Sequence, residues 1–122
     1  MSDELKKYAE GSHCEIWFSD KALKVFKKAP ANDRSRLIRI LEFVCDEGPQ
    51  NLNDQQFKAE GRFPVGNGKT VMVYAIKSYQ LRIYGVFVGR SPLQLLCPEG
   101  AIKKDNKADR KLLERVAKKM GE

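Results

Sequence analysis

The residues most able to carry chemistry are two cationic side chains in the second half of the chain. Lys77 and Arg82 flank Tyr79 and Gln80, within a stretch rich in β-forming residues. If Tyr79 and Gln80 form a hairpin turn, Lys77 lies directly opposite Arg82 on one face of the sheet. Such a pair can bind a phosphate and stabilise negative charge. The alternative is a pair of solvated residues at the end of a hairpin.

Strand alternation divides the other side chains of this hairpin between two faces. Ala75 and Tyr84 share the face of Lys77 and Arg82. This arrangement predicts that Lys77, Arg82 and Tyr84 point toward an open, concave surface. The opposite face is more apolar and is expected to meet a helical core, and its residues are Met72, Tyr74, Ile76, Leu81, Ile83 and Phe87.

The first half of the chain predicts one strand and two helices. Residues 13–18 alternate between apolar and polar side chains, the pattern of a strand with one buried face. Residues 21–29 and 33–46 repeat apolar side chains at three- and four-residue spacing, and Asn32 or Asp33 can cap the second of these helices. A short link that contains a proline joins the two helices, so we expect an antiparallel helical hairpin.

Three β-rich runs follow, at residues 71–77, 81–88 and 93–97. The sequence Gly-Asn-Gly at 66–68 supplies the positive-φ residues that a tight hairpin turn requires before the first run. A further short strand has room near Phe63.

The C-terminal segment predicts a final helix, since Asn106 and Asp109 are spaced as an N-cap and an acidic third helical residue. The element order is therefore β-α-α-β-β-β-α. The expected fold is α+β, with the helical hairpin and the C-terminal helix packed on a mainly antiparallel four-stranded sheet. We expect a single domain over residues 1–122, in which residues 1–12 are a flexible extension.

Composition limits the class of partner. The chain has 122 residues and is 42% hydrophobic, enough for one core. Its 23 Lys and Arg outnumber 16 Asp and Glu, and the net charge of +7 favours a polyanionic partner such as nucleic acid. A basic protein with no such partner is the alternative.

Cysteine usage and hydropathy indicate a cytoplasmic protein. The three cysteines are widely spaced and form no C-x-x-C pair, so neither a disulfide framework nor a zinc site is expected. No secretory signal and no apolar run of membrane-spanning length is found. The sequence therefore predicts no metal, no small-molecule cofactor and no membrane partner.

The C-terminal half carries a family resemblance. Tyr74-Ala75-Ile76-Lys77 and Leu81-Arg82-Ile83-Tyr84 resemble two consecutive strands of the RelE/ParE superfamily of bacterial toxins. Leu95-Leu96-Cys97, followed by Gly100-Ala101-Ile102-Lys103-Lys104, is similar to the HigB pattern of an apolar strand, a glycine, a hydrophobic residue and Lys-Lys before the last helix. The resemblance covers about residues 57–117 in pattern and the remainder in element order.

This resemblance implies a type II toxin that cleaves mRNA without a metal, within the ribosome, and that a cognate antitoxin protein silences. Metal-independent cleavage uses the 2′-hydroxyl as nucleophile, so the protein must accept a proton and stabilise the charge on phosphorus. The catalytic residues that it implies are Lys77 as base, Arg82 as phosphorane stabiliser, and Lys103 and Lys104 as phosphate ligands or acids. The RNA-binding candidates are Tyr84, Tyr79, Arg62, Lys58 and Lys107.

Two other functions stay open. One is a ParE-like toxin that inhibits DNA gyrase by binding, and the other is a degenerate family member that binds RNA or protein without cleaving it. Ala75 stands where the family has its first basic residue, and no tyrosine follows Lys103-Lys104. Both departures favour the alternatives, whereas the set of cations favours cleavage.

Overall fold

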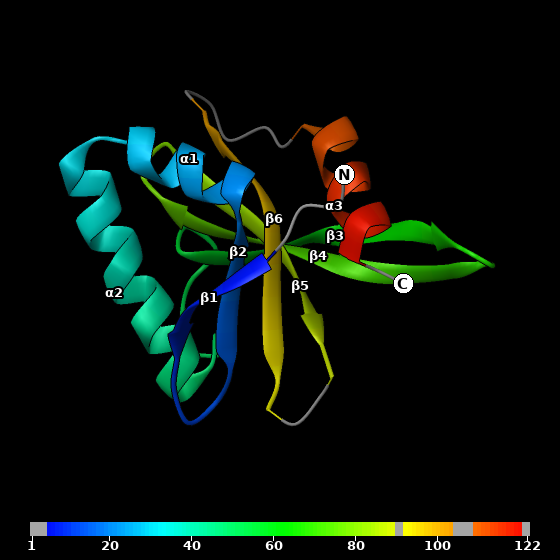
Figure 1. Ribbon diagram of the computed structural model, residues 1–122, viewed down its shortest axis with the longest axis horizontal. Helices are drawn as coiled ribbons and strands as arrows, with labels where there is room; N and C mark the ends of the chain where they lie inside the picture. Colours follow the sequence, from blue (N-terminus) through cyan, green and yellow to red (C-terminus); the bar gives the residue numbers. More distant parts are fainter. Residues whose placement is uncertain (1–4, 90–91, 104–108, 121–122) are drawn as a thin grey trace.

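The computed structural model describes residues 5–89, 92–103 and 109–120 (Figure 1). In the described residues, the strands and helices follow one another in the order β-β-α-α-β-β-β-β-α. Their bounds are β1 (Leu5–Glu10), β2 (Glu15–Ser19), α1 (Asp20–Lys28), α2 (Ala31–Glu47), β3 (Phe57–Gly66), β4 (Lys69–Ser78), β5 (Leu81–Val88), β6 (Gln94–Ile102) and α3 (Arg110–Met120).

In the described part of the chain, the strands form one six-stranded mixed sheet in the order β1-β2-β6-β5-β4-β3. Four of the five strand pairs are antiparallel, and the fifth, between β2 and β6, is parallel. The α+β class is correct, whereas the expected four-stranded antiparallel sheet is wrong. Two strands account for the difference in number: β1 at one edge, and at the other β3, which has ten residues where a further short strand near Phe63 was considered.

The two edge strands lack the regular alternation that a sequence pattern detects. In β1 the side chains are exposed or half-buried, and Tyr8 stacks on Phe18 of β2 with ring centroids 4.7 Å apart. Residues 5–10 thus form a strand where a flexible extension was expected. In β3 the pairing register shifts between Ala59 and Gly61, and this bulge interrupts the two-residue period.

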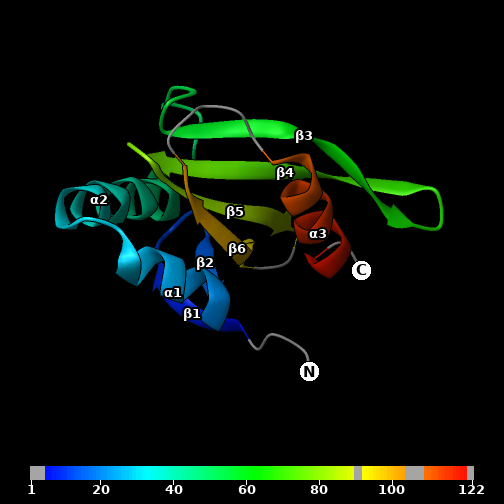
Figure 2. The same cartoon turned by 90° about the horizontal axis from the view of Figure 1, so that it is seen from above.

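In the described part of the chain, each helix packs mainly on the sheet. α1 lies against β6 and β2, whereas α2 lies along β4 and β1. The two helices diverge from the link between them (Figure 1), so the expected antiparallel helical hairpin is wrong. The third helix, α3, lies on the other side of β6 from α1 and α2 (Figure 2).

Two apolar clusters fill the space on the two faces of the sheet. Ala75 and Ile76 are neighbours in β4 and point to opposite faces. Ile76 joins the cluster beneath α1 and α2, together with Leu81 and Ile83, as the strand pattern predicted. Ala75 joins the cluster beneath α3. The sheet is therefore covered on both faces, and the second face is not the open surface that we expected.

The helix ends follow local hydrogen bonds. The Ser19 side chain caps α1 by accepting from the Ala22 amide at 3.0 Å. The second helix begins at Ala31, two residues earlier than predicted, and has no side-chain cap, so Asn32 and Asp33 lie inside its first turn. Asp109 Oδ1 accepts from the amides of Lys111 and Leu112 at the start of α3, whereas Asn106 lies outside the described residues.

Both β-hairpin turns occur where the sequence predicted them. Asn67 and Gly68 join β3 to β4 with φ of 53° and 73°, as a type I′ turn requires. Tyr79 and Gln80 join β4 to β5, and Lys77 pairs directly with Arg82. None of the described helices has the length and apolarity to cross a bilayer.

Candidate functional site

A pocket of about 450 Å³ lies at the end of the sheet, beside the β4–β5 turn. It gathers residues that are far apart in the sequence: α2, the loop before β3, and strands β3, β4 and β5 all contribute. Four lining side chains are cationic and one is a carboxylate. The lining residues are Arg36, Asp54, Gln55, Lys58, Lys77, Tyr79 and Arg82.

Strand register fixes the positions of three of the cations. Lys77 faces Arg82 across the β4–β5 pair, and Lys58 faces Ala75 across the β3–β4 pair. Residues two apart in a strand share a face, so Lys58 lies diagonally beside Lys77. The predicted juxtaposition of Lys77 and Arg82 on one face is therefore present, and Lys58 joins them.

Lys77 is held in a mainly desolvated position. The residue is 8% exposed, and its ammonium lies 3.8 Å from the Glu60 carboxylate. Burial lowers the pKa of Lys77 below its usual value, and the positive charges of Lys58 and Arg82 lower it further, against the opposing effect of Glu60. The neutral amine is thus more accessible than that of a solvated lysine.

Arg82 is attached to the turn that closes the pocket. Its Nη1 donates to the Tyr79 carbonyl at 2.5 Å, and the residue is 5% exposed. The Lys103 amide donates to the Gln80 carbonyl at 2.8 Å, so the chain leaving β6 passes beside the same turn. Lys104 and Lys107, the other two cations predicted in this segment, lie outside the described residues.

Two predicted RNA-binding residues lie elsewhere. Tyr84 is 1% exposed beneath α3, and burial, followed by the charge of Glu60, raises its pKa to about 12. Its ring cannot stack on a base unless α3 moves. Arg62 lies on β3, where its guanidinium donates to the side chain and carbonyl of Thr70, at 2.9 Å each. It lines a different hollow from Lys77.

Sequence reasoning missed three residues that line the pocket and the carboxylate that contacts Lys77. Arg36 stands off the apolar stripe of α2, where a solvated role is the usual one, yet its guanidinium carbon lies 4.8 Å from the centre of the Tyr79 ring. Asp54 and Gln55 belong to an irregular loop without a motif. Glu60 occupies the β3 bulge, which hides its face from a simple alternation rule.

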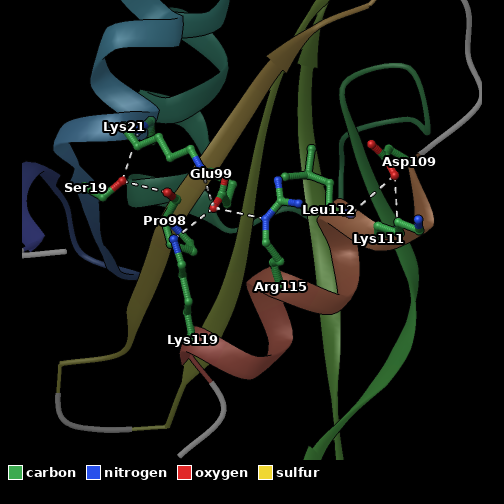
Figure 3. A network of polar contacts seen from close by, with 10 residues as sticks. Ser19, Lys21, Pro98, Glu99, Asp109, Lys111, Leu112, Arg115 and Lys119 are labelled. Atoms are coloured by element: carbon green, nitrogen blue, oxygen red, sulfur yellow. Dashed lines mark hydrogen bonds and ion pairs between the residues drawn. The ribbon is translucent and has the colours of Figure 1, made fainter. Parts of the chain in front are cut away.

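A second polar cluster connects α1 and α3 where β6 extends past its pairing with β2 (Figure 3). Glu99 of β6 is 1% exposed, and its carboxylate lies 2.9 Å from the Lys119 ammonium and 3.2 Å from that of Lys21. Arg115 Nε lies 3.7 Å away. Because β2 ends at Ser19, α1 and α3 both reach β6 here. This cluster joins α1 and α3 to β6, and no sequence motif indicated it.

The described side chains of His, Cys, Asp and Glu do not gather into a group of three that could hold a metal ion. Comparisons with protein-family models, curated proteins and solved structures found no match to this chain. The resemblance to RelE/HigB toxins therefore rests on the sequence motifs alone.

Proposed function

We propose that the chain is a metal-independent endoribonuclease of the RelE/HigB type and that the pocket beside the β4–β5 turn is its cleavage site. One observation carries the proposal. A desolvated lysine, Lys77, with a lowered pKa lies directly opposite Arg82, and two more cations, Arg36 and Lys58, line the same pocket. Converging cations of this kind suit the charge that develops on phosphorus during phosphodiester cleavage.

The proposed reaction needs only groups of the RNA and of this chain. Neutral Lys77 accepts the proton of a 2′-hydroxyl, whose oxygen attacks the adjoining phosphorus. Arg82 and Lys58 stabilise the additional negative charge on the phosphoryl oxygens. The bond from phosphorus to the 5′ oxygen breaks, and that oxygen takes a proton from a cation such as Lys103. The products are a 2′,3′-cyclic phosphate and a 5′-hydroxyl.

The direct test is cleavage of single-stranded RNA by the purified protein in EDTA, with identification of the two new ends. Lys77→Met should lower the cleavage rate 10²- to 10⁴-fold, the usual contribution of a general base. Lys77→Arg keeps the positive charge but removes the titratable amine, so it should bind RNA and cleave as slowly as Lys77→Met. Undiminished cleavage by both variants would contradict the proposal.

Arg62→Met is the matched control for Arg82→Met, because both remove one arginine from the sheet and only Arg82 lines the pocket. Arg82→Met should lower cleavage by about 10²- to 10³-fold, as expected for one lost stabilising donor. Arg62→Met should cleave as the unmodified protein does. Circular dichroism and urea unfolding of every variant separate loss of activity from loss of fold.

The toxin function is tested in bacteria. In this proposal the protein acts in the cytoplasm on ribosome-bound mRNA, and an antitoxin protein encoded beside it silences the toxin. Induction should arrest growth with fragmented mRNA, and Arg82→Ala should relieve both effects. Arrest with intact mRNA and altered DNA supercoiling would favour gyrase inhibition instead, and normal growth would favour the degenerate alternative.

A further inference from the structure

Tyr79 presents an aromatic ring at the rim of the pocket, and its backbone adopts a strained conformation there. The residue is 60% exposed and has a φ of 54°, a left-handed conformation that aromatic residues rarely adopt. Glycine or asparagine would form this turn without strain. Neither the turn nor the core therefore requires a tyrosine at this position.

Two arginines of the pocket fix the strained residue. Arg82 Nη1 donates to the Tyr79 carbonyl, and the Arg36 guanidinium lies over the ring at 4.8 Å. A cation–π contact at an exposed site stabilises a protein only weakly, so this contact does not by itself explain the aromatic residue. Strained backbone that is held by its surroundings is typical of ligand-binding positions.

The ring and the cations border one pocket, whose volume is in the range of small-ligand sites. Tyr79 is the aromatic residue among the lining side chains, and the cations Lys58, Lys77 and Arg82 line the interior beside it. An aromatic face beside clustered cations is the combination that binds an unpaired base next to a backbone phosphate.

We infer that Tyr79 is a stacking subsite for an unpaired nucleobase, so the pocket takes single-stranded RNA and excludes duplexes, whose bases are already stacked. The inference rests on the proposed function in that the cations must hold an RNA phosphate. Through the hydrogen bond from Arg82 to its carbonyl, Tyr79 sets the position of the base relative to that phosphate. Stacking tolerates every base, so the subsite selects strandedness rather than sequence.

The test compares the affinities of proteins with and without the Tyr79 ring for RNA with and without bases. The probes are two 2′-O-methyl RNA octamers, one of mixed sequence and one in which every nucleotide is abasic, so the two carry the same phosphates and neither can be cleaved. The unmodified protein should bind the octamer with bases about 5- to 100-fold more tightly, the range expected for one stacked base. In Tyr79→Asn, which suits the positive φ, this preference should fall to about 2-fold or less.

Three controls make the result specific. Tyr79→Phe retains the ring and should retain the preference, and both variants should unfold at the urea concentration of the unmodified protein or above it. A duplex of the same sequence should bind no more tightly than the abasic octamer. A full preference for bases in Tyr79→Asn overturns the subsite, as does equal weakening of both octamers by that substitution.

The outcome is separable from that of the proposed function. A preference for bases that depends on Tyr79, in a protein that does not cleave 2′-hydroxyl RNA, would retain the subsite and refute the nuclease. Cleavage that depends on Lys77 without any contribution of Tyr79 to base preference would retain the nuclease and refute the subsite. Failure of both octamers to bind would refute the subsite.

Discussion

At the scale of single residues, the pocket surrounds Lys77 with charges of opposite effect. Glu60 raises the pKa of Lys77, whereas Lys58 and Arg82 lower it, and burial lowers it most. A buried amine is useful as a base only when its neutral form is populated near the working pH. Burial, together with the balance between the neighbouring carboxylates and cations, therefore sets the pH at which the proposed chemistry begins.

Opposite charge substitutions should move the pH dependence of cleavage in opposite directions. Glu60→Gln removes the charge that raises the pKa of Lys77, so the rise of rate with pH should move to lower pH. Lys58→Met removes a charge that lowers this pKa, so the rise should move to higher pH. Single-turnover rates across pH 5–10 measure both shifts.

The same groups give an independent check on folding. Because the pKa of Lys77 is lower in the folded than in the unfolded protein, the folded state binds fewer protons between the two pKa values. The contribution of Lys77 to stability should therefore increase as the pH rises through that window toward 10.5. Urea unfolding of Lys77→Met should lack this increase, and an opposite slope would contradict the lowered pKa.

At the scale of elements, the sequence predicted best where local chemistry decides the structure. The Asn67-Gly68 turn and the register of Lys77 with Arg82 each depend on a few adjacent residues. Edge strand β1 depends instead on pairing with β2, and its own side chains carry little hydrophobic signal. Long-range pairing of this kind is invisible to a local periodicity.

The role of Tyr84 shows the same limit at the candidate site. Alternation placed Tyr84 correctly on the face of Lys77 and Arg82, but the period of a strand does not say which element covers that face. The third helix covers it at Tyr84 and stops short of the turn. The cations near the turn therefore line a pocket, whereas the tyrosine two residues further along β5 is buried.

We expect the shared carboxylate of Glu99 to couple α3 to α1, because cations of both helices contact it. Lys21 and Lys119 each contact it at close range, and their side chains are 54% and 34% exposed. Either ammonium alone can neutralise the buried charge, so Lys21→Met and Lys119→Met should each lower the free energy of unfolding by about 1 kcal/mol or less. The double variant leaves mainly Arg115 at 3.7 Å and should lose at least about 0.5 kcal/mol more than the sum.

Urea unfolding of the unmodified protein, the two single variants and the double variant measures the loss of unfolding free energy beyond the sum. Lys118→Met is the control for the helix, because Lys118 is exposed on α3 and its substitution removes the same charge as Lys119→Met. When Lys118→Met is combined with Lys21→Met, the losses in the free energy of unfolding should add. Additivity in both pairs would show that Glu99 does not couple α1 to α3.

At the scale of the whole molecule, the proposed binding of RNA by a chain of net charge +7 can take two forms. Binding through diffuse positive charge would involve lysines and arginines over the entire surface, whereas binding in the pocket would involve its lining cations. Each phosphate neutralised on a single strand contributes about 0.7 to the slope of log K against log salt. The slope therefore counts the phosphate contacts, and substitutions can assign them to residues.

We expect Lys58→Gln to reduce the slope for the 2′-O-methyl octamer by about 0.7, because Lys58 lines the pocket and its charge would be neutralised by a phosphate. Arg62→Gln removes the same charge from the same strand, but Arg62 is bonded to Thr70 and lies in the other hollow, so its slope should be unchanged. Fluorescence anisotropy between 50 and 300 mM salt measures both slopes. Equal losses in the two variants would mean that the chain attracts RNA by its overall charge, and the pocket would then have no special part in binding.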